Sequence, residues 1–258
     1  MKILHFASGD LWAGAEVQLY HLARELAATS QVDLRIVLLN NGQLADALRA
    51  VDVQVIILDE SSLSSLSILI HLYRLVLKFK PAVIHTHRSK ENVIGGMVAF
   101  MTRTASVRTA HGANENADHR FNLRRSTFTL LDKISGWIFQ SRIIAVSPEL
   151  AGKLKARYPH RKLTVIPNGI NIEAVIEKSN LPVKFKCSAD HFNIAFVGRF
   201  VPVKRTDIFI SIATEIINRS HERNIHFYMF GDGPLWAEAN HRILENGYQN
   251  RIHTPGFV

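Results

Sequence analysis

The residues of this chain best suited to bind an anion lie between Ile194 and Lys204, in the sequence IAFVGRFVPVK. An apolar run ends at Gly198, Arg199 follows directly, and Lys204 comes as a helical pattern begins. A glycine turn between a strand and a helix presents backbone N–H groups at the positive end of the helix dipole, and two cations add full charges. This pattern favours a pyrophosphate. An ordinary strand–turn–helix with solvated basic residues is the alternative, because glycine turns before helices are common in α/β folds.

A second glycine, Gly14, lies between the first apolar run and the first helical pattern, in GDLWAGAE. A glycine there lets the backbone approach a ligand at a helix N-terminus. A plain turn in which Glu16 complements the helix dipole fits as well. The sequence lacks the G-x-G-x-x-G fingerprint, which weakens the case for a nicotinamide oxidoreductase. It also lacks a G-x-S-x-G elbow, a Walker lysine loop and an H-E-x-x-H helix.

Three histidines lie at the ends of predicted strands. His85 and His87 alternate in VIHTHR and therefore share one face of a strand. Metal pairs use this spacing, but no cysteine or adjacent acidic residue accompanies them, so we expect no metal site. His111 precedes Gly112 at the end of another strand, on the carboxyl edge where open α/β sheets bind ligands. It is a candidate contact to a substrate, and a core or capping histidine is the alternative.

Short apolar runs alternate with helical patterns along the chain. They predict strands at 3–7, 34–39, 53–58, 82–86, 107–111, 143–146, 163–166, 194–197, 226–230 and 251–254. Helical stripes at 66–77 and 209–217 are expected to face a core. This alternation predicts an α/β fold of parallel sheets covered by helices on both faces, in the doubly wound arrangement.

The alternation is interrupted over residues 169–192, just after the turn signal PNG. We therefore predict two doubly wound, Rossmann-like domains, at 1–168 and 193–258, joined by an interdomain connection at 169–192. Only three strands and two helices follow the connection. Because a doubly wound half usually carries five or six strands, we expect the second domain to be incomplete.

The net charge of +9 is unevenly placed, and +8 of it lies in residues 1–168. Basic residues gather in segment 119–142, beside Trp137: Arg120, Arg124, Arg125 and Lys133. In the same segment Leu130, Ile134, Trp137 and Ile138 follow a helical spacing that favours a core-facing side. Arginines beside Phe and Trp are also typical of a helix on an anionic membrane, so both interpretations remain. Nucleic-acid binding is weakly supported, because no recognised module interleaves these residues.

The cellular compartment follows from what the sequence lacks. Cys187 is the only cysteine, which excludes an internal disulfide and a cysteine-rich zinc site and favours a reducing compartment. The N-terminal residues predict a first strand rather than a signal peptide, and no run approaches the ~20 apolar residues of a membrane span. We expect a cytoplasmic protein, peripheral at the inner face of the membrane.

Seven segments, taken in order, resemble the family 4 glycosyltransferases of the two-domain GT-B fold. They are WAGAE, HTHRS, TAHG, AVSPEL, VIPNGI, FVGRFVPVKR and YMFGDGPLWAEA, and they extend through the whole chain. The resemblance implies a retaining, metal-independent hexosyltransferase without a cofactor. Its donor would be a nucleotide-diphosphate sugar, and its acceptor an envelope glycan or a lipid-linked glycan.

The resemblance also implies roles for individual residues. Arg199 and Lys204 would clamp the donor diphosphate, with a backbone contact from Gly14 of the first domain. His111 would contact the donor sugar near the reaction centre. Gly198 and Gly231 would line the nucleotide pocket, and the basic first domain would bind the acceptor.

The chain departs from the family pattern in two places. Arg205 follows the lysine where the family often has glycine, and the family's acidic Glu-x7-Glu segment would belong beyond PGFV. The chain thus resembles a glycosyltransferase truncated within its donor domain, and we expect it to transfer little or no sugar as it stands. A truncated remnant or binding module without turnover is the alternative. Coding sequence downstream of Val258 that encodes the acidic segment would identify a fragment of an enzyme.

Overall fold

The structure is a computed structural model that describes residues 1–112, 123–180, 185, 187, 190–219 and 224–257. Backbone contacts divide these residues into two compact units, the first reaching Ile172 and the second starting at Glu173. Each unit contains a parallel sheet with packed helices, so the predicted α/β class is confirmed. All ten predicted strands are present, each shifted by no more than a few residues.

The first unit contains a seven-stranded parallel sheet in the order β3-β2-β1-β4-β5-β6-β7. The strands are β1 (Lys2–Ala7), β2 (Asp33–Leu38), β3 (Gln54–Ile57), β4 (Val83–Thr86), β5 (Ala105–Ala110), β6 (Arg142–Ala145) and β7 (Leu163–Val165). The strand order reverses between β1 and β4. In doubly wound sheets such a reversal opens a crevice at the carboxyl ends of the strands, where ligands bind.

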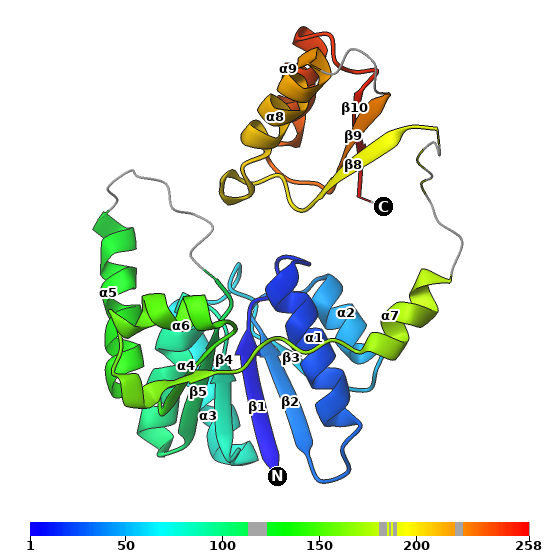
Figure 1. The fold of residues 1–258 in the computed structure, drawn as a ribbon. Coiled ribbons are helices and arrows are strands. Elements are labelled where there is room, and N and C mark those ends of the chain that lie inside the picture. The colour runs from blue at the N-terminus through cyan, green and yellow to red at the C-terminus, as the bar shows by residue number, and fades with distance from the viewer. Residues whose placement is uncertain (113–122, 181–184, 186, 188–189, 220–223, 258) are drawn as a thin grey trace. The chain divides into compact units, whose positions relative to one another are not determined.

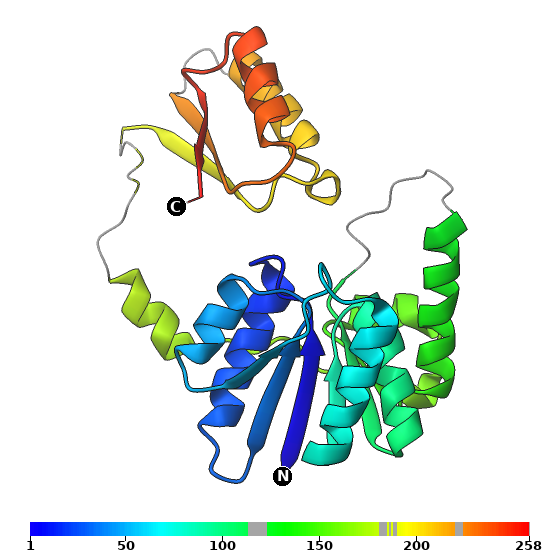
Figure 2. The same cartoon turned by 180° about the vertical axis from the view of Figure 1, so that it is seen from behind.

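Helices cover both faces of this sheet (Figures 1 and 2). On one face, α1 (Gly14–Ala27) and α2 (Gln43–Arg49) pack against alternate residues of β1, including Ile3. On the other, α3 (Ser65–Phe79) and α4 (Ser89–Thr102) pack against Leu4 and Phe6. The remaining described helices of this unit are α5 (Leu123–Ile138), α6 (Pro148–Lys155) and the 3₁₀ turn η1 (His160–Lys162). Helix α7 (Ile172–Ser179) begins at the last residue of this unit and lies otherwise in the second unit. Helix α7 lies in the predicted connection, where the sequence had indicated no helix.

Only part of the apolar stripe of α3 that was predicted to face the core is buried. Ile68, Leu72 and Val76 face the core, whereas Leu66 is 68% exposed and Leu77 is 49% exposed. The prediction was wrong at these positions because α3 carries apolar residues around most of its circumference. Periodicity alone then fails to select one face.

Helix α5 contradicts the core interpretation of its apolar residues, since Leu130, Ile134, Trp137 and Ile138 are all exposed. The helix instead buries small residues against α4 and β5. A Cβ on Gly96 would lie 2.7 Å from Ser135 Oγ, and a Cβ on Gly136 would lie 2.2 Å from Arg108 Nη2. Ser135 Oγ also donates a hydrogen bond to the Asn92 carbonyl at 2.6 Å. This close approach leaves the large side chains on the outer face.

The second unit is built on the sheet β10-β9-β8, with β8 (Phe192–Val197), β9 (Ile225–Phe230) and β10 (Ile252–Gly256). Besides α7, its described helices are α8 (Thr206–Arg219) and α9 (Trp236–Glu245), and the 3₁₀ turn η2 (Pro202–Lys204) precedes α8. Both helices pack on one sheet face around Phe200, Phe227 and Met229. The unit thereby places the loops after β8 and β9 at one edge.

Gly231 has a structural reason to be glycine. Its φ is +133°, and a Cβ there would lie 2.0 Å from the Gly198 carbonyl oxygen. Backbone groups of the two loops also bond directly, since Phe200 N–H donates to the Asp232 carbonyl at 2.9 Å. The two strand ends therefore meet backbone to backbone.

We expect Gly231→Ala to destabilise the second unit by at least ~2 kcal/mol, because it adds both backbone strain and a steric overlap. Urea unfolding combined with hydrogen exchange of the β9 amides measures this. Arg205→Gly is the matched control. Arg205 has φ +51°, which glycine adopts readily, so its loss should change stability by less than ~1 kcal/mol. Wild-type stability of Gly231→Ala would contradict the role assigned to this close approach.

Candidate functional site

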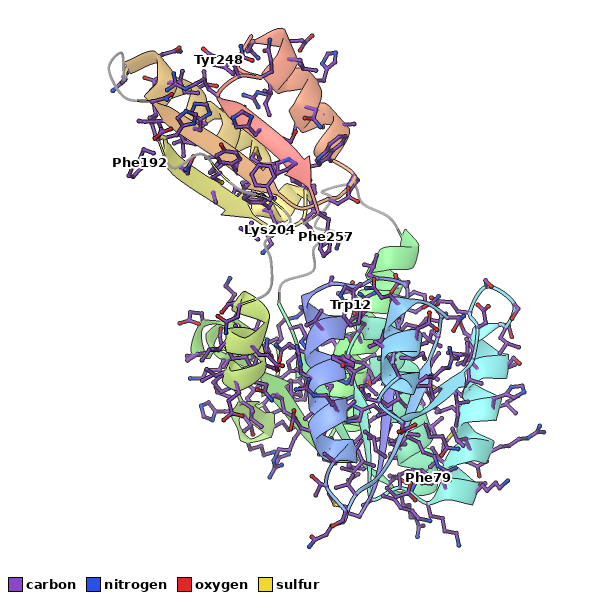
Figure 3. All side chains as sticks on the ribbon, turned by 90° about the vertical axis from the view of Figure 1, so that its right-hand side faces the viewer. Trp12, Phe79, Phe192, Lys204, Tyr248 and Phe257 are labelled. Carbon is purple, nitrogen blue, oxygen red and sulfur yellow. The ribbon has the colours of Figure 1, made fainter. Side chains whose placement is uncertain are left out.

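Several polar residues of the first unit gather at the carboxyl edge of its sheet, around the end of β1 and the start of α1. Figure 3 labels Trp12 at this edge and Phe79 at the opposite edge. Gly14 is the first residue of α1 and is exposed, and a Cβ there would lie more than 4 Å from every other group of the described residues that could obstruct it.

Four histidines form a cluster beside this edge: His5, His85, His87 and His111. His5 and His85 are register partners on β1 and β4, with ring centroids 4.7 Å apart. His87 stacks on His85 at 4.6 Å and on His111 at 5.4 Å. His85 Nε2 lies 2.8 Å from Thr109 Oγ1. The structure thereby brings together all three histidines named from the sequence and adds His5.

All four imidazoles favour the neutral form. Burial lowers the pKa of His85 and of His111 to about 4, assisted by His111 for the first and by Arg88 for the second. Burial, with the neighbouring imidazoles, also holds the pKa of His5 and of His87 well below the usual value. At neutral pH each ring therefore carries one N–H donor and one acceptor nitrogen.

Three of these rings could in principle hold a metal. His5, His85 and His87 each offer a nitrogen, and these atoms lie within 4.8 Å of one another. Neutral imidazole is a common zinc ligand. However, His5 Nδ1 and His87 Nε2 are already 3.1 Å apart and bonded to each other. The expectation that the chain works without a metal stays a prediction.

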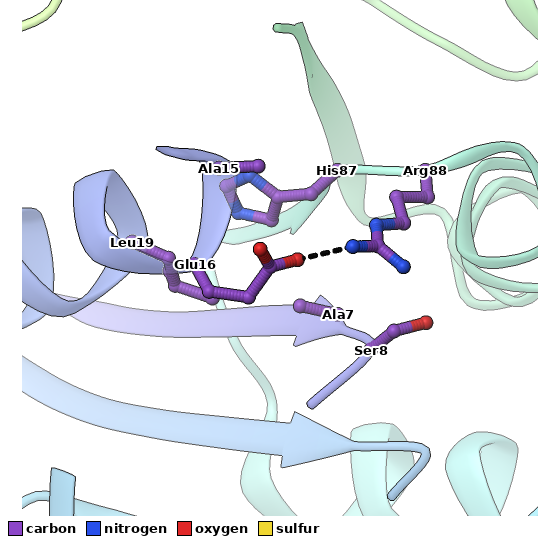
Figure 4. Close-up of a pocket in the computed structure, with 7 residues that line it drawn as sticks. All are labelled: Ala7, Ser8, Ala15, Glu16, Leu19, His87 and Arg88. Atoms are coloured by element: carbon purple, nitrogen blue, oxygen red, sulfur yellow. Dashed lines mark hydrogen bonds and ion pairs between the residues drawn. The ribbon is translucent and has the colours of Figure 1, made fainter. Parts of the chain in front are cut away.

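A small hollow opens beside the cluster, lined by Ala7, Ser8, Ala15, Glu16, Leu19, His87 and Arg88 (Figure 4). The buried Glu16 carboxylate accepts a bond from Arg88 at 2.5 Å and another from the Ala13 N–H at 3.2 Å. Glu16 therefore anchors both the start of α1 and the guanidinium.

Arg88 places a positive charge at this edge. Besides Glu16 it contacts the Asp10 carboxylate at 2.9 Å. Glu91, one helical turn into α4, is fully buried and accepts a bond from Ser8 Oγ, and burial raises its pKa. Two carboxylates thus hold Arg88 in place beside His87 and His111. Sequence reasoning missed Arg88, Asp10 and His5, because no local signal shows which strand neighbours which.

In the second unit the predicted diphosphate residues lie around the ends of β8 and β9. Gly198 follows β8, and its N–H donates to the Phe230 carbonyl at 2.9 Å. Arg199 comes next and is half-buried, whereas Lys204 is exposed in η2, just before α8. Gly231 follows β9. The structure brings Gly198, Arg199, Lys204 and Gly231 to one edge of this sheet, and their ligand-binding roles stay predictions.

The surface predicted for a membrane or acceptor lies on α5. Lys133 is exposed, and Trp137 is 51% exposed with its Nε1–H donating to the Arg157 carbonyl. Arg120 lies outside the described residues, as do the side chains of Arg124 and Arg125. Of the helices that the structure describes, none is long and apolar enough to cross a membrane.

In comparisons with known proteins, this chain is similar to two bacterial glycosyltransferases. A UDP-Gal:α-D-GlcNAc-diphosphoundecaprenol α-1,3-galactosyltransferase of Escherichia coli is 27% identical over 273 residues, covering 98% of this chain and 70% of that protein. The capsular polysaccharide biosynthesis glycosyltransferase CapM of Staphylococcus aureus is 26% identical, covering 78% and 53%.

The fold is also found in solved structures. Anabaena HepE in complex with UDP and glucose superimposes with a TM-score of 0.78 at 19% identity, covering 100% of this chain and 70% of HepE. The structure and these neighbours support the GT-B type of α/β fold. A family model, Glycosyltransferase Family 4, matches residues 12–174, which is more than half of the sequence. This chain therefore belongs to Glycosyltransferase Family 4.

Proposed function

We propose that the chain transfers a sugar from a nucleotide-diphosphate sugar to a lipid-linked or polysaccharide acceptor, at the low rate expected from its sequence. The family match over residues 12–174 is the observation that carries this proposal. The E. coli relative is named for a UDP-Gal donor and a diphosphoundecaprenol acceptor, and HepE was solved with UDP and glucose. These names support a UDP-sugar as the donor class.

In this proposal the second unit binds the donor diphosphate through Arg199 and Lys204. Gly198 and Gly231 line the nucleotide pocket, Gly14 contributes a backbone contact, and His111 contacts the sugar. The chemistry favours these roles, because the leaving group is a nucleotide diphosphate that gains negative charge as the sugar departs. Cations and N–H groups aimed at that charge lower the barrier.

We further propose that transfer needs no metal and retains the anomeric configuration. A radiolabel assay with a panel of UDP-sugars and GDP-sugars, in EDTA, is the test. The expected product keeps the donor's anomeric configuration by NMR, and its yield is the same with EDTA as with added Mg²⁺. Loss of transfer in EDTA that Zn²⁺ or Mg²⁺ restores would contradict metal independence. UDP binding without transfer would favour the binding-module alternative.

The acceptor side is proposed to contact an anionic membrane at the cytoplasmic face. Exposed apolar residues continue from α5 onto α4 and include Phe100, Met101, Phe128, Leu130, Trp137 and Ile138. Phe100 lies 5.3 Å from Phe139 at the end of α5, so the two helices share this surface. A lipid-linked acceptor would be reached from such a surface.

We expect the chain to co-sediment with phosphatidylglycerol vesicles at low salt and to be released as salt rises. At physiological salt, the attraction between exposed charges is largely screened beyond ~8–10 Å. The double variant Leu130→Ser/Ile138→Ser should bind at least ~10-fold more weakly, because each side chain loses apolar burial. Leu66→Ser/Leu244→Ser removes equally exposed leucines elsewhere and should bind normally. Equal binding to neutral vesicles would remove the electrostatic part of the proposal.

A further inference from the structure

Three of the clustered histidines form a continuous line of hydrogen bonds, from His5 through His87 to His111. His5 Nδ1 lies 3.1 Å from His87 Nε2, and His87 Nδ1 lies 3.1 Å from His111 Nε2. The remaining ring nitrogen of His111, Nδ1, is buried and has no hydrogen-bond partner in the part of the chain that the structure describes. We call these three residues the histidine line. Its free end is thus His111 Nδ1.

The histidine line permits only two arrangements of its protons. A neutral imidazole has one N–H and one acceptor nitrogen, so His87 must donate with one nitrogen and accept with the other. If His5 donates to His87, then His87 donates to His111, and all three rings carry their proton on Nδ1. If His111 donates instead, all three carry it on Nε2. The tautomer of His111 is therefore tied to that of His5 through His87.

We propose that His87, held by His5, fixes His111 as the Nδ1–H tautomer and so makes it a hydrogen-bond donor toward the bound sugar nucleotide. This inference rests on the proposed function. An oxygen that gains negative charge during transfer requires a donor, which the Nδ1–H tautomer supplies. The other tautomer would turn a lone pair toward that oxygen. His87 is thus a positioning residue, and it acts through His111.

His85 lies outside this line although it stacks within the cluster. Its Nε2 contacts the Thr109 hydroxyl at 2.8 Å. Thr109→Val removes that contact and leaves all three members of the line in place. Thr109→Val is therefore a matched control for the variants of the histidine line, because it lies on the same face of the sheet.

The test reads the tautomer directly, by ¹⁵N–¹H correlation NMR of the whole chain with ¹⁵N-labelled histidine. His111 is assigned from the signals lost in His111→Gln. We expect a protonated Nδ1 and a hydrogen-bonded, unprotonated Nε2 in the wild type and in Thr109→Val. In His87→Phe, and in His5→Phe, the His111 signals should move to the average of the two tautomers. If one of these two variants fails to fold, the other still provides the test.

Transfer measurements supply a second readout in the radiolabel assay. His87→Phe should lower the rate at saturating donor by about tenfold or more and leave the donor KM nearly unchanged, as for a hydrogen bond to a charged group. A His111 protonated on Nε2 in the wild type, or an unchanged tautomer in both Phe variants, would overturn the inference. The tautomer is read without turnover. Hence a wild type that neither binds UDP nor transfers sugar defeats the proposed function alone, and a wrong tautomer with normal transfer defeats this inference alone.

Discussion

Replacing Lys204 by alanine is expected to weaken UDP binding about tenfold or more while leaving uridine binding unchanged. Lys204 stands exposed in η2 at the entry to α8, and Arg199 follows the glycine turn after β8. A hydrogen bond to a charged group contributes roughly 1.5–3 kcal/mol, and ~1.4 kcal/mol corresponds to a factor of ten. Because the proposed partner is the diphosphate, a nucleoside without phosphates should not sense the change. Isothermal titration of both ligands measures it.

Arg219→Ala is the matched control for this variant. Arg219 lies at the other end of α8 and pairs with Glu215 on the helix surface, so its loss removes one positive charge from the same unit. UDP affinity should remain near the wild-type value. If Lys204→Ala weakens UDP and uridine equally, or if Arg219→Ala weakens UDP as much, the diphosphate assignment of Lys204 fails.

Acid is expected to destabilise the first unit as pH falls from ~6.5 toward ~4, because the clustered histidines are buried in the neutral form. The pKa of His85 falls from 6.5 in an unfolded chain to about 4 in the fold, chiefly through burial. Between these values the unfolded chain binds more protons, so stability is full above pH ~6.5 and is lost as pH falls toward ~4. His85 alone accounts for about 2 kcal/mol by pH ~5 and about 3 kcal/mol below pH ~4.

The measurement is urea unfolding at a series of pH values between 7 and 4.5, with hydrogen exchange of the β1 and β4 amides to identify the first unit. His85→Phe combined with Thr109→Val removes the titrating ring without leaving the hydroxyl unpaired, and should flatten the pH dependence. His71→Asn, on the exposed surface of α3, is the matched control and should keep it. A wild-type stability that stays constant from pH 7 to 5 would show that the histidines are hydrated in solution.

The sequence determined the strands of this fold and the order in which they occur. Local periodicity placed every strand within a few residues of its observed position, since strand and helix periods are properties of neighbouring residues. The glycine turn after an apolar run singled out Gly198, and the family resemblance pointed to Gly231 at the end of the next strand. Their close approach, 2.0 Å between the Gly198 carbonyl oxygen and a Cβ on Gly231, explains why no side chain fits at Gly231.

Tertiary structure decided which faces are buried. Periodicity suggested that Leu130, Ile134, Trp137 and Ile138 face a core, and the structure exposes them. The decisive residues were small ones: Gly96 and Ser135 allow α4 and α5 to approach closely, and Gly136 allows α5 to approach Arg108 of β5. A hydrophobicity pattern gives such residues little weight, although their size controls how two helices pack.

The histidine cluster is the part of the site that only the tertiary structure could assemble. His85, His87 and His111 stood out because they end strands, whereas His5 carried no signal. His5 meets His85, 80 positions later in the sequence, because β1 and β4 pair at one register. Pairing order and register in a parallel sheet depend on the crossover helices and on burial across the whole unit. The sequence therefore identified three of the candidate histidines. The fold determined their hydrogen-bond partners and lowered their pKa values.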